Sequence, residues 1–162
     1  DVASFFMNKE NSAVPGSCLT VIQEGSRPIL VEIQALLVPT TMAFARRVAS
    51  GVDAKRLELL LAVLQKHVKI PVDRCDVFIN VVGGLKISET AADLAVTLAI
   101  VSSYKNKPLS GIVAIGEIGL LSEVKKVVNL KGRIKEAEKI GAKKIISSET
   151  NKYLSEIVRG IG

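Results

Sequence analysis

The chain has 162 residues, of which 48% are hydrophobic and 23% charged, and its net charge is +6. This composition predicts one globular domain with its own core and excludes a disordered or disulfide-dependent chain. Because there are only four Phe, two Tyr and no Trp, the core must be built from aliphatic side chains. No apolar run reaches the ~18 residues that a membrane span needs, so we expect no membrane partner.

The N-terminal part of the chain predicts a linker followed by a β-hairpin. Residues 1–14 are polar and irregular apart from Val2 to Met7, and we expect them to be a linker to a domain over 15–162. Strands over 17–23 and 29–38 flank a turn that contains Gly25, which favours a hairpin. Since the chain begins with an Asp instead of Met, we expect it to be part of a longer protein.

The residues after the hairpin predict a loop, a helix and a buried strand. Residues 40–51 show no clear period, so we interpret them as a flexible loop. A helix over 54–67 is expected after Asp53, a residue that can cap its N-terminus. Residues 76–82 are almost continuously apolar, which is typical of a strand buried on both faces.

The rest of the chain continues this alternation, with a short β excursion at 121–128. The expected elements are a central helix over 91–104, a strand over 111–117, a helix over 130–140, a strand over 143–147 and a helix over 152–158 that Thr150 caps. Alternating strands and helices after an opening hairpin predict a layered α/β fold, with α and β elements in separate layers (α+β layered).

Cofactor motifs are absent from the sequence. Neither the phosphate-binding loop of ATPases nor the glycine fingerprint of dinucleotide-binding proteins occurs. Cys18 and Cys75 lie in or beside apolar runs, and we expect two buried free thiols. Together with the one histidine, His67, they are too few for a zinc site, so we predict no metal and no cofactor in this chain.

Two segments resemble the Ser-Lys active site of the Lon protease domain. Residues 83–93 lead from a strand into a helix, and residues 129–133 open another helix about forty residues later. In Lon proteases a serine opens the first helix and a lysine of the second segment is its base. Lys131 matches that lysine, but Ala91 stands at the serine position. A methyl group cannot attack a carbonyl, so these are positions of a degenerate dyad.

Basic residues supply the candidates for DNA binding or subunit contact. Arg46, Arg47 and Lys86 are all expected on loops beside strand ends, where they could hold phosphates or acidic groups of a neighbouring subunit. The lysines of the C-terminal half alternate with glutamates. They indicate either a solvated helix face or a stripe that faces nucleic acid.

Several segments together resemble the C-terminal Lon-protease-like domain of the RadA (Sms) family of bacterial DNA-repair proteins. They are residues 24–36, 45–47, 51–53, 56–57, 81–86, 91–95 and 116–120. The resemblance implies a Lon-protease-like domain with an opening hairpin and a ribosomal-protein-like fold. It also implies a longer protein with a zinc finger and a RecA-like ATPase, so zinc, ATP and magnesium would belong to parts outside this chain.

The same resemblance implies partners and a location. We expect single-stranded or branched DNA, a homo-hexamer of the full-length protein, and a recombinase as a further partner. The expected location is the bacterial cytoplasm, or an organelle if the source is eukaryotic.

Three functions remain open from the sequence. The first is a non-catalytic scaffold, oligomerisation and DNA-binding domain of an ATP-dependent DNA-repair and recombination protein that acts in branch migration. The second is a serine-lysine peptidase of the Lon type, for which Lys131 could be the base. The third is a stand-alone adaptor that binds a protein partner.

Overall fold

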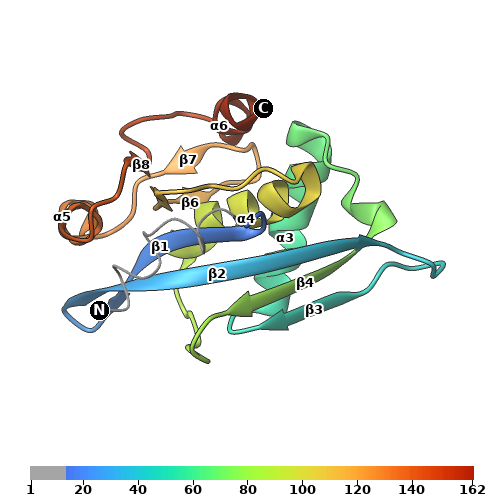
Figure 1. The fold of residues 1–162 in the computed structure, drawn as a ribbon, viewed down its shortest axis with the longest axis horizontal. Coiled ribbons are helices and arrows are strands. Elements are labelled where there is room, and N and C mark those ends of the chain that lie inside the picture. The colour runs from blue at the N-terminus through green and yellow to red at the C-terminus, as the bar shows by residue number, and fades with distance from the viewer. Residues whose placement is uncertain (1–13) are drawn as a thin grey trace.

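A long antiparallel hairpin lies at the middle of a six-stranded mixed sheet, as the computed structural model of the chain shows for residues 14–162 (Figure 1). The strand order is β3-β4-β2-β1-β5-β8. The strands of this sheet are β1 (Ser17–Glu24), β2 (Arg27–Pro39), β3 (Arg47–Ser50), β4 (Cys75–Val81), β5 (Ile112–Ala114) and β8 (Lys144–Ile146). The predicted layered α/β fold is confirmed.

Besides the six-stranded sheet, the described residues form four α-helices and a small two-stranded ribbon. The helices are α3 (Ala54–Val63), α4 (Asp93–Lys105), α5 (Leu130–Lys139) and α6 (Leu154–Ile161), and the ribbon pairs β6 (Glu117–Ile118) with β7 (Val124–Lys125). No helix within 14–162 is long and apolar enough to cross a membrane.

Strand β2 organises the sheet because it is long enough to pair on both sides. Its first half pairs with β1 in the hairpin, whose turn places Gly25 at a positive φ of 61°. Its second half pairs antiparallel with β4, from Ile33 opposite Val81 to Pro39 opposite Cys75. β5 and β8 then extend the β1 side in parallel, whereas β3 extends the β4 side and forms one edge.

The two faces of the sheet are covered unequally. Helices α3, α4 and α6 pack on one face, where α4 is buried over almost its whole length, as the sequence predicts for a central helix. On the opposite face α5 covers β1, β5 and the start of β2 at Leu30, with Leu130 and Ala137 against Leu19 and Val113. The β2–β4–β3 part of that opposite face has no helix over it among the described residues.

Two sequence predictions about the β4 side are wrong. Residues 40–51 are not a loop throughout, because Arg47–Ser50 forms the edge strand β3. Four residues are too few for an alternating pattern to be visible in the sequence. β4 is not buried on both faces either, since Asn80 is exposed and Phe78 is only half-buried.

Helix boundaries differ by a few residues from those expected. The helix after Asp53 ends at Val63 and continues as a π-helical turn over Leu64–Val68. The last helix begins at Leu154, later than expected, because the Glu156 carboxylate accepts the backbone N–H groups of Lys152 and Tyr153. The predicted linker over 1–14 lies, except for Val14, outside the described residues.

Both cysteines are buried and free, as predicted. Burial raises the pKa of the Cys18 thiol to about 12, so it stays protonated at physiological pH. Within 14–162, no group of three or more His, Cys, Asp or Glu residues is placed to hold a metal ion.

Candidate functional site

The segment from Gly83 to Asp93 connects β4 to α4 and contains Ala91, which the sequence resemblance matches to the serine position of Lon proteases. Gly83 and Gly84 adopt positive φ angles of 90° and 75° at its start, which only glycine adopts without strain. The chain then runs along the end of β3, where the Ile87 N–H donates to the Gly51 carbonyl at 2.8 Å. A 3-10 turn over Thr90–Ala92 leads directly into α4.

Ala91 itself is buried and offers only a methyl group. Two backbone hydrogen bonds, one of Ala91 and one of Leu94, join this part of the chain to Gly116, in the strand region that follows α4. The Ala91 carbonyl accepts from the Gly116 N–H at 2.9 Å, and the Leu94 N–H donates to the Gly116 carbonyl at 3.0 Å. The position is therefore ordered and packed but carries no nucleophile.

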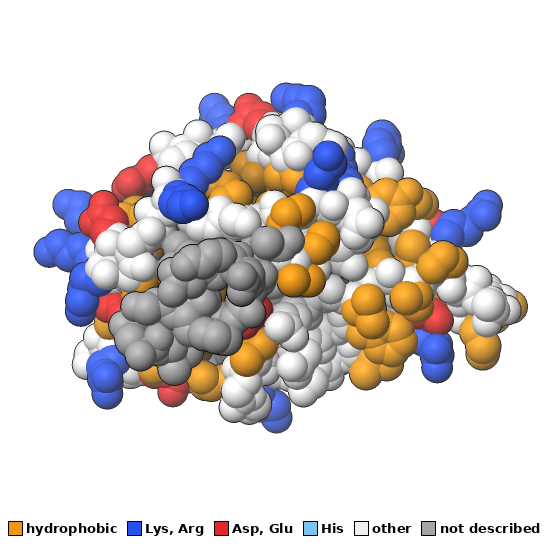
Figure 2. Space-filling model, viewed as in Figure 1, with side chains coloured by type: hydrophobic (Ala, Val, Ile, Leu, Met, Phe, Trp, Pro, Cys, Tyr) orange, Lys and Arg blue, Asp and Glu red, His pale blue; other side chains and the backbone are white. Residues whose placement is uncertain are grey.

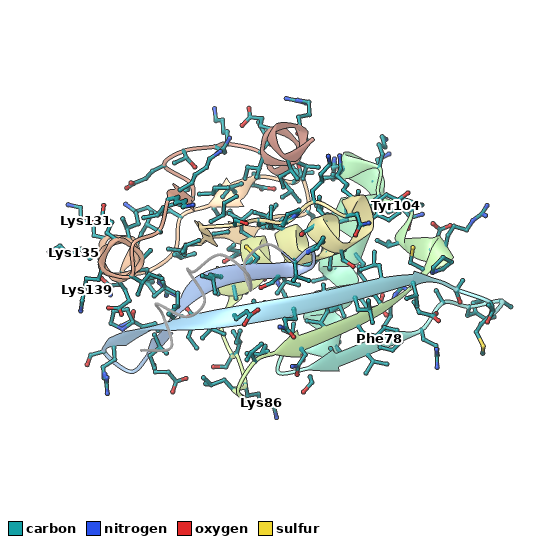
Figure 3. All side chains as sticks on the ribbon, viewed as in Figure 1. Phe78, Lys86, Tyr104, Lys131, Lys135 and Lys139 are labelled. Carbon is teal, nitrogen blue, oxygen red and sulfur yellow. The ribbon has the colours of Figure 1, made fainter. Side chains whose placement is uncertain are left out.

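Lys131, the match to the Lon lysine, is exposed. It lies in the first turn of α5 and shares the outer side of that helix with Lys135 and Lys139 (Figure 3). The structure therefore does not place the Lys131 ammonium in a buried pocket, which is where a lysine that acts as a base is expected.

A different cation of α5 holds the segment before Ala91. The guanidinium of Arg133 is fully buried and makes two hydrogen bonds of 2.8 Å to the carboxylate of Glu89. It also donates to the carbonyls of Val21 at 3.1 Å and Val128 at 2.9 Å. The Gln23 N–H donates to the same carboxylate at 2.6 Å. Arg133 thus ties together α5, β1 and the start of the turn.

The ionisation of Glu89 reflects these contacts. Burial alone would raise the pKa of Glu89, but hydrogen bonds from Arg133 and the Gln23 N–H, with the charge of Arg133, lower it below its ordinary value. Glu89 is therefore ionised at neutral pH, and the ion pair with Arg133 is complete there.

A second ion pair holds the other end of the segment. The Asp93 carboxylate accepts from Arg56 of α3 through two guanidinium nitrogens, and from the Ile118 N–H at 3.0 Å. Burial raises the pKa of Asp93, whereas the hydrogen bond to Asp93 raises the pKa of Arg56 and favours a charged pair. Because three donors are directed at the Asp93 carboxylate, we conclude that Asp93 is ionised.

Between the two ion pairs, Thr90 donates its hydroxyl proton to Glu117 at 2.7 Å. Every polar side chain from Glu89 to Asp93 therefore has a protein partner. This arrangement holds the turn in place, and none of these groups is positioned to activate a nucleophile at residue 91.

Next to this turn is a cavity of about 540 Å³ between β3, the N-terminus of α3 and residues 86–93. Lys86 lines it and is exposed, together with the Arg56–Asp93 pair and the apolar residues Val52 and Val96. Lys86 lies on a loop, as predicted from the sequence.

Arg46 and Arg47 are in more ordered positions than the sequence predicts. The Arg46 guanidinium pairs with Asp76 at 3.3 Å and lies 5.7 Å from the ring centre of Phe78. Arg47 begins β3, and its guanidinium donates to the backbone carbonyls of Cys75 at 2.7 Å and Val72 at 3.0 Å. Both guanidinium groups are thus engaged within the domain.

The sequence did not predict the structural roles of Arg133, Glu89 and the Arg56–Asp93 pair. Arg133 lies among the basic residues of the C-terminal half, and its charge alone does not set it apart from them. A signal for its burial is present, because Arg133 falls between Leu130, Ile134 and Ala137 on the apolar side of α5. A charged residue on that side needs a buried partner of opposite charge.

Comparison with known proteins adds the family. No protein-family model matches the chain. It is 46% identical over 156 residues to the DNA repair protein RadA of Haemophilus influenzae, and 48% identical over 145 residues to RadA of Pseudomonas aeruginosa. It is 45% identical over 150 residues to RadA of Escherichia coli K12.

The chain corresponds to the C-terminal part of a RadA-family protein. The matches cover 96%, 89% and 92% of this chain, but only 34%, 32% and 33% of these relatives. The chain therefore spans about a third of the length of these RadA relatives.

We predict that the Glu89–Arg133 pair stabilises the fold in a pH-dependent way. Because the folded pKa of Glu89 is lowered, its contribution is fully present above the ordinary glutamate pKa of about 4.3 and is lost as the pH falls through the folded pKa. Urea unfolding of wild type and Glu89→Gln should show a stability difference of about 2 kcal/mol at pH 7 that shrinks below pH ~4.

The matched control is Glu149→Gln, since Glu149 is exposed. This variant should match wild type at every pH. A Glu89→Gln difference that is the same at pH 7 and pH 3.5 would contradict the role of the Glu89 charge.

Proposed function

We propose that this chain is the non-catalytic scaffold, oligomerisation and DNA-binding domain of a RadA-like DNA-repair protein. The observation that carries the proposal is the turn around Ala91. Its polar groups are all bound to structural partners, its central side chain is a methyl, and Lys131 is exposed. Such a turn can hold a surface in shape but has no group for acyl transfer.

The remaining features of the proposal concern the whole protein. Since the chain covers about a third of its RadA relatives, we place ATP hydrolysis, magnesium, zinc and branch migration in the other two thirds. We expect the full-length protein to be a DNA-dependent ATPase that assembles as a hexamer, contacts a recombinase and works in the bacterial cytoplasm.

A Lon-type peptidase is the alternative, and one assay separates it from the proposal. Wild type and Ala91→Ser should both fail to hydrolyse fluorogenic peptides, because adding a hydroxyl does not bring the exposed Lys131 to residue 91. Turnover in Ala91→Ser that disappears in Ala91→Ser with Lys131→Ala, or a covalent adduct of wild type with a serine-reactive inhibitor, would establish the alternative.

The outer side of α5 is the surface that we assign to DNA. Lys131, Lys135 and Lys139 are all exposed and recur every four residues, so they are spaced by about 6 Å along the helix. Glu136 pairs with Lys139 at 3.6 Å, and Glu138 is a second carboxylate on the same helix. The three ammonium groups outnumber these carboxylates, which suits contact with phosphates. Lys86 is a separate candidate at the cavity beside β3.

We predict that changing Lys131, Lys135 and Lys139 together to Gln weakens DNA binding. Loss of three phosphate contacts should lower the affinity at least tenfold near 0.1 M salt and reduce the salt slope for duplex DNA by up to ~3. Fluorescence anisotropy with labelled single-stranded, duplex and branched DNA over a series of salt concentrations measures both quantities.

The matched control removes the same charge elsewhere. Lys55, Lys66 and Lys107 are exposed on other elements, and changing them to Gln should leave the salt slope nearly unchanged. Equal effects of the two triple variants would show that binding follows net charge alone and would reject α5 as the DNA surface.

A further inference from the structure

Among residues 14–162, no element covers an apolar surface on the side of the sheet opposite α3 and α4. It consists of Leu36 and Val38 of β2, Val48 of β3, Phe78 of β4, and Met42 and Phe44 of the loop 40–46. We call it the open apolar surface. Figure 2 shows hydrophobic side chains gathered over the end of β2 and the loop that follows it, at the right of the view.

The side chains of this surface are largely exposed. Phe44 is 88% exposed, Met42 and Leu36 are each 56% exposed, and Val48 is 50% exposed. With about 150–250 Å² for an aromatic side chain, the surface adds up to an area on the order of 500 Å². An apolar area of this size matches the largest patches on typical monomers, which are often functional, and it is more than half of the ~800 Å² per partner of a stable interface.

The surface combines a hollow with a projecting aromatic side chain. Its flat part contains a hollow of about 900 Å³ whose apolar lining includes Leu36, Val48 and Phe78. Phe44, which projects from the neighbouring loop, is not part of that lining. A projecting aromatic side chain and an apolar hollow at different places on one molecule can be joined between two copies of it.

The charges beside this surface favour a protein partner over DNA. Arg46 is neutralised by Asp76, and Arg47 donates to two backbone carbonyls, so neither guanidinium is available as a free phosphate contact. The Arg46–Asp76 pair lowers the positive charge at this place, which reduces the repulsion between two copies that each have a net charge of +6.

We propose that the open apolar surface is the contact between copies of this chain, with Phe44 and Met42 of one copy inserted into the hollow of a second copy. The proposal rests on the proposed scaffold role and names the surface that performs it. Arg46 and Arg47 then act at a subunit contact, where they hold β3 and β4 in the shape that the partner copy meets.

Sedimentation velocity of the purified chain over about 1–200 μM tests the proposal. Wild type should associate, and Phe44→Asp should associate at least tenfold more weakly, because a carboxylate would enter an apolar hollow. Val128→Asp is the matched control, since Val128 is 75% exposed and lies before α5. It should associate like wild type, and all three proteins should melt at similar temperatures because both sites are exposed.

A photo-reactive phenylalanine analogue at position 44 tests the direction of the contact. Irradiation should give dimers in which residue 44 is joined to Leu36, Val48 or Phe78 of the other copy, as read by peptide mass spectrometry. Cross-links to α5 or α6 instead, or equal association of Phe44→Asp and wild type, would overturn the assignment of this surface. A wild type that stays monomeric throughout would overturn the self-association part of the proposed function as well, whereas the anisotropy assay judges DNA binding separately.

Discussion

The buried ion pair between Arg133 and Glu89 is the constraint on which the rest of the site depends. It joins α5, β1 and the turn before α4, three segments that are distant in the sequence. A fully buried guanidinium is costly unless its donors are satisfied. Here the carboxylate and two backbone carbonyls satisfy them, so the pair fixes where α5 lies on the sheet.

Helix α5 presents cations on two sides, and the two sides differ in their contacts. Lys131 and Arg133 are two residues apart and therefore lie on different sides of α5. Lys131 is exposed beside Lys135 and Lys139, whereas Arg133 turns inward to the segment that contains Ala91. Arg133 binds the carboxylate of Glu89. The three lysines face solvent, where a polyanion can contact them.

The sequence predicted the hairpin, the central helix and the alternation of strands and helices, because these have strong periodic patterns. It did not predict β3, whose four residues gain their order from β4 and from the carbonyls that Arg47 binds. Nor did it predict the open face of β4, since an apolar residue such as Phe78 looks the same in a core and at an interface. Ala91 and Lys131 were found from a motif, but the partners Arg56, Glu89 and Arg133 depend on contacts between distant segments.

The DNA-binding proposal uses the basic outer side of α5, and the self-association proposal uses the open apolar surface on β2–β4–β3. The turn around Ala91 lies between the elements that carry these surfaces. It is held in place by the Arg133–Glu89 and Arg56–Asp93 ion pairs. A double-mutant cycle of Glu89→Gln and Arg133→Gln, measured by urea unfolding at pH 7, tests this most directly. The account predicts a coupling energy of about 1–3 kcal/mol. Additive effects of the two substitutions would contradict it.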